Sequence, residues 1–330
     1  MAEDSQSNDD AIADLVPAGL RERLRGRPLI VQRPVWGRRH GRHAAIRAGL
    51  GLEFRDHRAY VPGDDPRHLD WRAVARRERL VLRRTESEDE LSITVVLDGG
   101  AGMDYGEGEQ HKLRYARAIA GGLAWLAQRQ GDPVGLAVGR QQTVDAALVR
   151  PRSGKDRLTA LSHRLAEIEP RGRCPWVSLI GTVAPRLPRR SLVVVLSDLL
   201  DPGTTDEDAD EVQRELISGL ALLRARQHDV VLVQVLHRDE IEFPWTERSM
   251  IRFEDLRELR PALEAPGRSL RDDYLRRVGE HLEGLRDQCE AEGLVLLPLV
   301  TDLPVEDGFV RLLGRLAGEA PHDELAEVSR

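Results

Sequence analysis

The stretch that decides the fold reads LSITVVLD, from Leu91 to Asp98. It is apolar, rich in β-branched residues and ends on a carboxylate, which is typical of a buried strand that stops at the edge of a sheet. A second stretch of the same kind, SLVVVLSD, runs from Ser191 to Asp198 and again ends on an aspartate. Such near-continuous apolar runs indicate strands that are covered on both faces, as in parallel sheets.

Working outward from these two stretches, the chain alternates between strand and helix patterns. Further strands are expected at 133–139, 143–149, 229–236 and 294–300, and helices at 110–130, 155–168, 175–185, 207–227, 269–291 and 306–317. This alternation predicts a mostly parallel sheet with helices on both faces. The link between 139 and 143 is too short for a parallel crossover, so that pair must be antiparallel. We therefore expect an α/β, doubly wound, six-stranded sheet in the order 3-2-1-4-5-6, with strand 3 antiparallel.

This topology places the two aspartates together. Ligands of doubly wound sheets sit beyond the carboxyl ends of the strands, where the winding direction reverses. In the expected order that point lies between the first and fourth strands, which end in Asp98 and Asp198. Two converging carboxylates suit a hard divalent cation such as Mg²⁺, or acid–base chemistry if their pKa values are split. Either aspartate alone also fits a simpler role, which is to cap the turn after its strand.

The part of the chain before Leu91 has a different composition. Residues 1–14 are polar and predict a disordered tail. Residues 15–90 predict an arginine-rich module that opens with a short helix over 15–25, is broken by Pro and Gly, and contains short strands such as 79–83. Residues 91–318 form the sheet domain, and 319–330 a C-terminal tail.

Charge separates these parts as well. The whole chain carries a net charge of -7, but residues 21–85 hold 18 Arg against 7 Asp or Glu, so this segment is +11 and the rest is -18. A basic segment of this kind suggests a nucleic acid as one possible partner, with an affinity that falls steeply with salt. Its aromatic residues, Trp36, Phe54, Tyr60 and Trp71, are scattered and form no stacking array.

Other features of the sequence indicate a cytoplasmic protein. The first ten residues are acidic and polar, unlike a secretory signal. No apolar run approaches the roughly 20 residues that a membrane span requires. The two cysteines, Cys174 and Cys289, have neither the spacing of a zinc site nor the number of a disulfide scaffold.

The strand pattern and the two aspartates together resemble the von Willebrand factor A fold. In that family a metal-ion-dependent adhesion site uses a DxSxS turn after the first strand, completed by a threonine and a further aspartate. Here the turn reads DGGAG from Asp98, so Gly100 and Gly102 stand where the family has its ligand serines. Loss of two hydroxyl ligands weakens a Mg²⁺ site, which needs near-octahedral oxygen coordination. The resemblance therefore implies a degenerate site at Asp98 and Asp198 that holds no metal or cofactor, with Mg²⁺ as the less favoured alternative.

A longer motif lies upstream, in GLGLEFRDHRAYVPGDDPRHLDW from Gly49 to Trp71, followed by Ala75 and Arg76. It resembles the signature of the bacterial family called domain of unknown function 58, and the resemblance extends over roughly residues 20–318. The signature positions are Gly51, Glu53, Phe54, Arg58, Tyr60, Gly63, Asp64, Asp65, Arg67, Asp70, Trp71, Ala75 and Arg76. Bidentate Arg–carboxylate pairs among them fit a structural clasp on the sheet, and a direct binding role fits equally.

Members of that family are associated with MoxR-type AAA+ ATPases and are regarded as adaptors or co-chaperones without established catalytic residues. The resemblance thus implies a non-enzymatic partner of such an ATPase, with a client protein as a further partner. No nucleophile, base and orienting group can be named that would support an enzyme. A Mg²⁺-dependent protein-binding module and a nucleic-acid-binding protein are the alternatives.

Overall fold

In the computed structural model, the described residues are 15–31, 54–59, 81–85, 91–141, 143–153, 155–200, 206–247, 250–256 and 261–319. The chain divides into two compact units, one of residues 47–90 and one of the remaining chain. The described part of the smaller unit is an antiparallel pair, β1 (Phe54–Ala59) and β2 (Val81–Thr85), in which Arg58 lies opposite Leu82. β2 corresponds to the strand expected at 79–83. Apart from Phe54 and Arg58 in β1, the family-signature residues lie outside the described residues.

The larger unit is built on a six-stranded sheet in the order β10-β7-β6-β3-β4-β5. Its strands are β3 (Ile93–Asp98), β4 (Val134–Arg140), β5 (Thr143–Arg152), β6 (Leu192–Ser197), β7 (Asp229–Leu236) and β10 (Val295–Val300). All neighbours pair in parallel except β4 and β5, which are antiparallel. Counted within this sheet, the order is the predicted 3-2-1-4-5-6, and the antiparallel third strand is confirmed.

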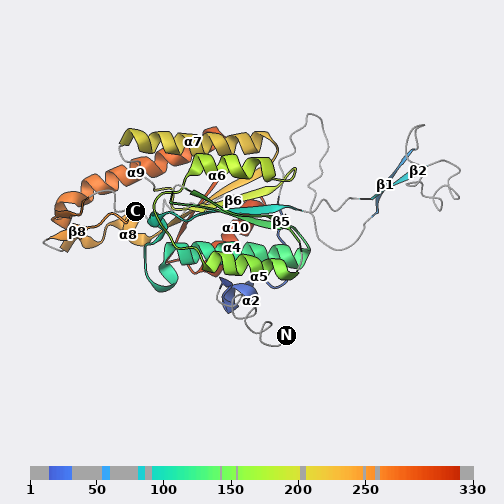
Figure 1. Ribbon diagram of the computed structural model, residues 1–330, viewed down its shortest axis with the longest axis horizontal. Helices are drawn as coiled ribbons and strands as arrows, with labels where there is room; N and C mark the ends of the chain where they lie inside the picture. The colour runs from blue at the N-terminus through green and yellow to red at the C-terminus, as the bar shows by residue number, and fades with distance from the viewer. Residues whose placement is uncertain are drawn as a thin grey trace. The chain divides into compact units, whose positions relative to one another are not determined.

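Helices cover both faces of this sheet, as Figure 1 shows. One face carries α2 (Ala18–Arg23), α4 (Lys112–Gln130), α5 (Lys155–Ala166) and α10 (Val305–Leu316), and the other carries α6 (Trp176–Val183), α7 (Asp206–Ala225) and the end of α9 (Gly267–Ala291). The strands alternate between two apolar clusters: Val95 and Leu97 of β3 face the first, and Val96 between them faces the second. This period of two explains why β3 is buried on both faces.

Residues 15–31 pack on the sheet of the larger unit. The sequence pattern groups them with the arginine-rich module. Leu15, Leu20 and Leu24 are buried in the first apolar cluster. A close approach makes this possible, because a Cβ on Gly121 of α4 would lie 2.6 Å from Leu15. Residues 15–31 therefore belong to the core of the larger unit, since their leucines find an apolar face there and would be exposed in a polar module.

An insertion between β7 and α9 has no counterpart in the predicted elements. It consists of α8 (Arg238–Glu242), a short 3₁₀ turn, and a hairpin of β8 (Ile251–Phe253) and β9 (Leu263–Ala265). Three aromatic residues of the insertion pack together with Tyr274 of α9, namely Phe243, Trp245 and Phe253. The ring centroids in contact lie 5.0–6.2 Å apart. In Figure 1 this insertion and the start of α9 lie at the same end of the larger unit. Among the described residues, no helix combines the length and the apolar character needed to span a bilayer.

Candidate functional site at the carboxyl ends of β3 and β6

Asp98, the last residue of β3, is held in place by its own turn and by the neighbouring strand. Its Oδ1 accepts a hydrogen bond from the backbone N–H of Gly100 at 2.7 Å. Its Oδ2 accepts one from Oγ of Ser197, the last residue of β6, at 2.6 Å. The side chain is buried, with 4% of the residue exposed. The adjacent pairing of β3 and β6 thus joins two positions that are 99 residues apart in the sequence.

Asp198 is buried and follows β6 directly, next to Ser197, which donates a hydrogen bond to Asp98. One carboxylate oxygen, Oδ1, accepts a bond from the Leu200 N–H at 3.1 Å, which closes the turn after the strand. The Asp198 carbonyl accepts a bond from Nε2 of Gln234 on β7 at 3.1 Å. The capping role that the sequence allowed for this aspartate is therefore present, but it uses only one of the two carboxylate oxygens.

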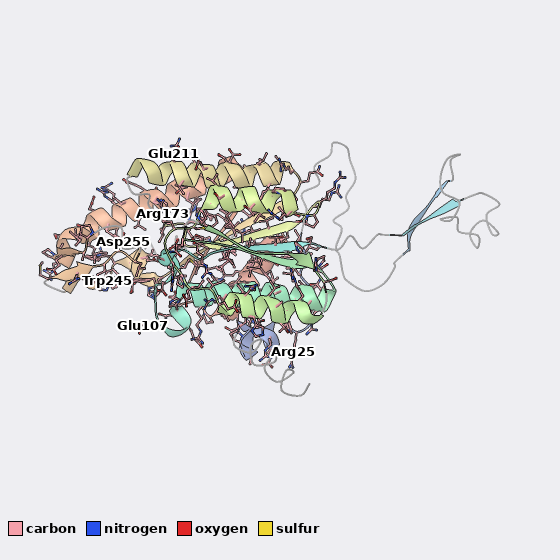
Figure 2. All side chains as sticks on the ribbon, viewed as in Figure 1. Arg25, Glu107, Arg173, Glu211, Trp245 and Asp255 are labelled. Atoms are coloured by element: carbon pink, nitrogen blue, oxygen red, sulfur yellow. The ribbon has the colours of Figure 1, made fainter. Side chains whose placement is uncertain are left out.

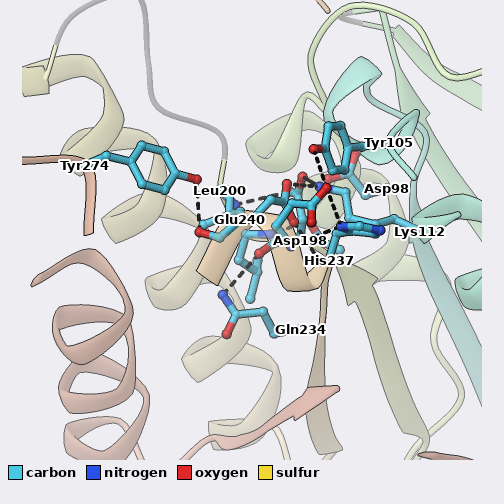
Figure 3. A network of polar contacts seen from close by, with 12 residues as sticks. Asp98, Tyr105, Lys112, Asp198, Leu200, Gln234, His237, Glu240 and Tyr274 are labelled. Atoms are coloured by element: carbon cyan, nitrogen blue, oxygen red, sulfur yellow. Dashed lines mark hydrogen bonds and ion pairs between the residues drawn. The ribbon is translucent and has the colours of Figure 1, made fainter. Parts of the chain in front are cut away.

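The second oxygen of Asp198 binds a cation that belongs to the chain itself. Nζ of Lys112, the first residue of α4, lies 2.8 Å from Asp198 Oδ2 and 2.6 Å from Glu240 Oε1. The Lys112 side chain is 1% exposed, against 7% for Asp198 and 16% for Glu240. Burial alone lowers the pKa of Lys112, but the two carboxylates raise it above the ordinary lysine value. The ammonium group is therefore charged and shared between the carboxyl groups of buried Asp198 and half-buried Glu240 (Figure 3).

Glu240 reaches this site from the insertion that follows β7. It sits in the first turn of α8, where His237 forms a capping box: the His237 N–H donates to Glu240 Oε2 at 2.8 Å, and the Asp239 N–H donates to His237 Nδ1 at 3.2 Å. Burial raises the pKa of Glu240, and the nearby Asp198 carboxylate raises it further against the lowering effect of Lys112. One cation is thus shared by two carboxyl groups, each of which disfavours the charged form of the other.

Two tyrosines enclose the ion cluster. The Tyr105 hydroxyl donates to Asp239 Oδ2 at 3.2 Å, and the Tyr105 ring packs edge-on against His237 at 5.0 Å between centroids. Lys112 Nζ lies 5.8 Å from the centre of the same ring, within the range of a cation–π contact. From α9, the Tyr274 hydroxyl donates to the Glu240 carbonyl at 3.0 Å. Figure 3 shows how these contacts join the sheet edge to α8 and α9.

Gly100 and Gly102, in the turn after Asp98, lie close to the carboxylates of Asp98 and Asp198. A Cβ on Gly100 would lie 2.9 Å from Asp98 Oδ1, and one on Gly102 would lie 2.8 Å from Asp198 Oδ2. Carbon atoms do not approach a carboxylate oxygen this closely without displacing it. The carboxylates therefore occupy the space that side chains at these positions would need.

A cavity of about 180 Å³ opens over this corner. Its lining residues are Asp98, Gly100, Gly102, Gly172, Arg173, Cys174, Asp198, Leu200, Glu240, Glu254, Asp255 and Leu256. Five of these are carboxylates and one is an arginine, so the wall of the cavity is predominantly negative. Figure 2 shows Arg173 and Asp255 at this end of the sheet, where the loop after β8 meets the sheet edge.

Asp98 and Asp198 thus line one cavity, together with Gly100 and Gly102. Sequence reasoning did not identify Lys112, Glu240, Ser197 or the tyrosines. A signal for Lys112 exists, because it is one of two lysines in a chain with 49 basic residues. Glu240 lies within the insertion after β7, which the sequence does not predict, and carries no comparable signal.

The fit of this corner to a divalent cation is poor. Asp98 accepts bonds from Gly100 and Ser197, and Asp198 accepts bonds from Leu200 and Lys112, so both carboxylates are engaged. Among the described residues, no three His, Cys, Asp or Glu side chains converge closely enough to hold a metal ion. The expectation that the chain works without metal or cofactor stays a prediction.

Comparison with known proteins gives a family and no function. The family profile described as "Protein of unknown function DUF58" matches residues 56–283. Uncharacterised proteins of Mycobacterium bovis and of two Mycobacterium tuberculosis strains are each 27% identical over 317 residues, which cover 92% of this chain and 94% of theirs. Among solved structures, the PilB minor pilin of Streptococcus sanguinis is similar with a TM-score of 0.38 and 8% identity, over 72% of this chain and 63% of the pilin. A likeness this weak carries no argument.

Proposed function

The chain belongs to the DUF58 family of proteins of unknown function, and we propose that it acts as a non-enzymatic adaptor or co-chaperone of a MoxR-type AAA+ ATPase. The ATPase is proposed as the partner because the family resemblance implies it. A client protein is the proposed third member of the complex. The sheet domain is a von Willebrand factor A-like binding domain whose metal site is degenerate. The compartment that fits such a partner is the cytoplasm.

The observation that carries this proposal is the closed ion cluster at the corner. Lys112 is bonded to both Asp198 and Glu240, and Asp98 is bonded to Ser197. Glu240 is half-buried and the other four residues are buried. A hydrolytic site needs a nucleophile, a base and a group that orients the base toward the substrate. Here the charged groups orient one another and fix the ends of β3, β6 and α8. This arrangement favours a rigid binding surface over a reaction centre.

The electrostatics of the cavity support a basic partner surface. Glu254 and Asp255 stand in the loop after β8, beside the buried Asp98 and Asp198. A concave wall with one predominant sign of charge attracts the opposite sign and speeds association, most strongly at low salt. We therefore assign the ATPase contact to this end of the sheet domain.

The test is a co-purification of the tagged chain with the MoxR-type ATPase of the same genome, in the ATP-, ADP- and nucleotide-free states. Capture in at least one state, weakened by salt, is the expected result. A matched pair of double variants locates the contact: Glu254→Gln with Asp255→Asn on the cavity, and Glu283→Gln with Asp287→Asn at exposed positions of α9. No capture in any state contradicts the adaptor function, and equal capture by both variants contradicts the assigned surface.

The two alternatives make separate predictions. A Mg²⁺-dependent binding module requires partner binding that EDTA abolishes and that Asp98→Ala removes. The poor fit of the corner to a metal argues against it. A nucleic-acid-binding protein requires a gel shift at low salt from the basic segment 21–85, most of which lies outside the described residues.

A further inference from the structure

We propose that the ammonium group of Lys112 is the resident cation of this corner and takes the place of a divalent metal ion. The Asp98–Asp198 corner is then complete without metal, and its geometry is independent of divalent ions. The inference concerns the sheet domain alone, so it holds or fails whether or not an ATPase is the partner.

The position of Lys112 Nζ is the first argument. It lies between carboxylates from two different elements, at 2.8 Å from Asp198 and 2.6 Å from Glu240. These elements meet at the point of the doubly wound sheet where a ligand is expected. A cation is needed there, because two carboxylates buried side by side repel each other at high cost in a low dielectric. Lys112 meets this need from the first residue of α4.

The donors that a metal would require are the second argument. Mg²⁺ prefers six oxygens at about 2.0–2.1 Å in near-octahedral geometry. Gly100 and Gly102 bring no oxygen from their side chains, and a Cβ at these positions would lie only 2.9 Å from Asp98 Oδ1 and 2.8 Å from Asp198 Oδ2. The hydroxyl of Ser197 donates to Asp98 and accepts from the Leu199 N–H. The remaining oxygens of the corner are thus committed to holding the loops and the ammonium group.

The choice of lysine is the third argument. Lys112 and Lys155 are the only lysines among the 49 basic residues, and all the others are arginine. An ammonium group is a compact point charge with three donors, whereas guanidinium is a wide planar fork. A compact cation fits a buried space between two carboxylates and resembles a metal ion more closely. Because all the other basic residues except Lys155 are arginine, a lysine at position 112 indicates that the space between the two carboxylates requires a cation smaller than guanidinium.

The experiment removes the tethered cation and asks whether a metal ion replaces it. Purified full-length protein is melted in EDTA, Mg²⁺ or Mn²⁺, as wild type, Lys112→Ala and the control Lys155→Ala. We expect that neither the melting temperature of wild type nor that of Lys155→Ala changes between EDTA, Mg²⁺ and Mn²⁺. Lys112→Ala frees Asp198 Oδ2 and Glu240 Oε1, and divalent ions can bind through one or two carboxylates with waters in the remaining positions. We therefore expect its melting temperature to rise with Mn²⁺ by roughly 5–10 °C when the ion is at about a hundred times its dissociation constant. Adding Asp198→Asn to Lys112→Ala abolishes the rise.

Two results overturn the proposal. One is a folded Lys112→Ala that gains no response to either ion. The other is a wild-type protein that binds Mg²⁺ or Mn²⁺ in titration calorimetry and loses that binding in Asp198→Asn. The second measurement needs only proteins that keep Lys112, so it decides the matter even if Lys112→Ala does not fold. Tight wild-type metal binding at the corner would mean that Lys112 is displaced and is not the resident cation.

Discussion

Replacing Lys112 by methionine gives the sharpest test of how the ion cluster contributes to stability. Methionine keeps the length of the side chain and removes its charge. Asp198 and Glu240, with side chains 7% and 16% exposed, then face each other without a counter-ion. Removing one partner of a buried ion pair costs about 3–5 kcal/mol, because the charge left behind is neither solvated nor paired. We therefore expect the free energy of unfolding to fall by that amount, and the melting temperature to fall by roughly 10 °C.

The double variant Lys112→Met with Glu240→Gln provides the internal control. It removes one of the two stranded charges, so it is predicted to be more stable than Lys112→Met alone although it carries one more substitution. Urea denaturation followed by far-ultraviolet circular dichroism measures both, with Lys155→Met as the matched lysine control. The reasoning is refuted if Lys112→Met lies within about 1 kcal/mol of wild type, or if the double variant is the less stable of the two.

Three further predictions address other parts of the structure. Gly102→Ser places a Cβ 2.8 Å from Asp198 Oδ2, so we expect the free energy of unfolding, measured by urea titration, to fall by about 1–3 kcal/mol. An unchanged urea midpoint would show that the carboxylate moves aside freely. Tyr274→Phe removes the hydrogen bond to the Glu240 carbonyl and is expected to cost about 0.5–1.5 kcal/mol; a differential scan that finds no loss would contradict the coupling of α9 to α8. Burial raises the pKa of the Cys289 thiol to about 11, so the unfolded chain ionises first and stability falls as the pH rises from about 9 to 11. In a Cys174→Ser background, Cys289 should react with thiol reagents only as fast as the protein opens, and rapid labelling of the native protein would refute its burial.

The sheet was predictable because its strands carry a strong and local signal. LSITVVLD and SLVVVLSD are apolar at most of their buried positions, and the short link after 139 allows only antiparallel pairing for β5. The order of the strands followed from general rules of winding. Those rules also predict that Asp98 and Asp198 lie together, and both residues line the same cavity.

The ion cluster was not predictable in the same way. Lys112 and Glu240 are 128 residues apart, and they meet only because the insertion after β7 folds α8 over the sheet edge. α8, β8 and β9 are short, with three to five residues each, so they show no periodicity that a pattern can reveal. The packing of segment 15–31 on the sheet is hard to predict for a related reason. Its leucines reveal a need for an apolar partner, but not which surface supplies it.

The central claim is that the acidic end of the sheet domain binds the AAA+ ATPase without a metal ion. The most direct measurement is the dissociation constant of the purified ATPase in EDTA, in the nucleotide-free state. We expect tight binding by wild type and by Glu283→Gln with Asp287→Asn, and binding weakened at least tenfold, or about 1.4 kcal/mol, by Glu254→Gln with Asp255→Asn. Equal affinity of the two double variants, or binding that appears only when Mg²⁺ is added, would contradict it.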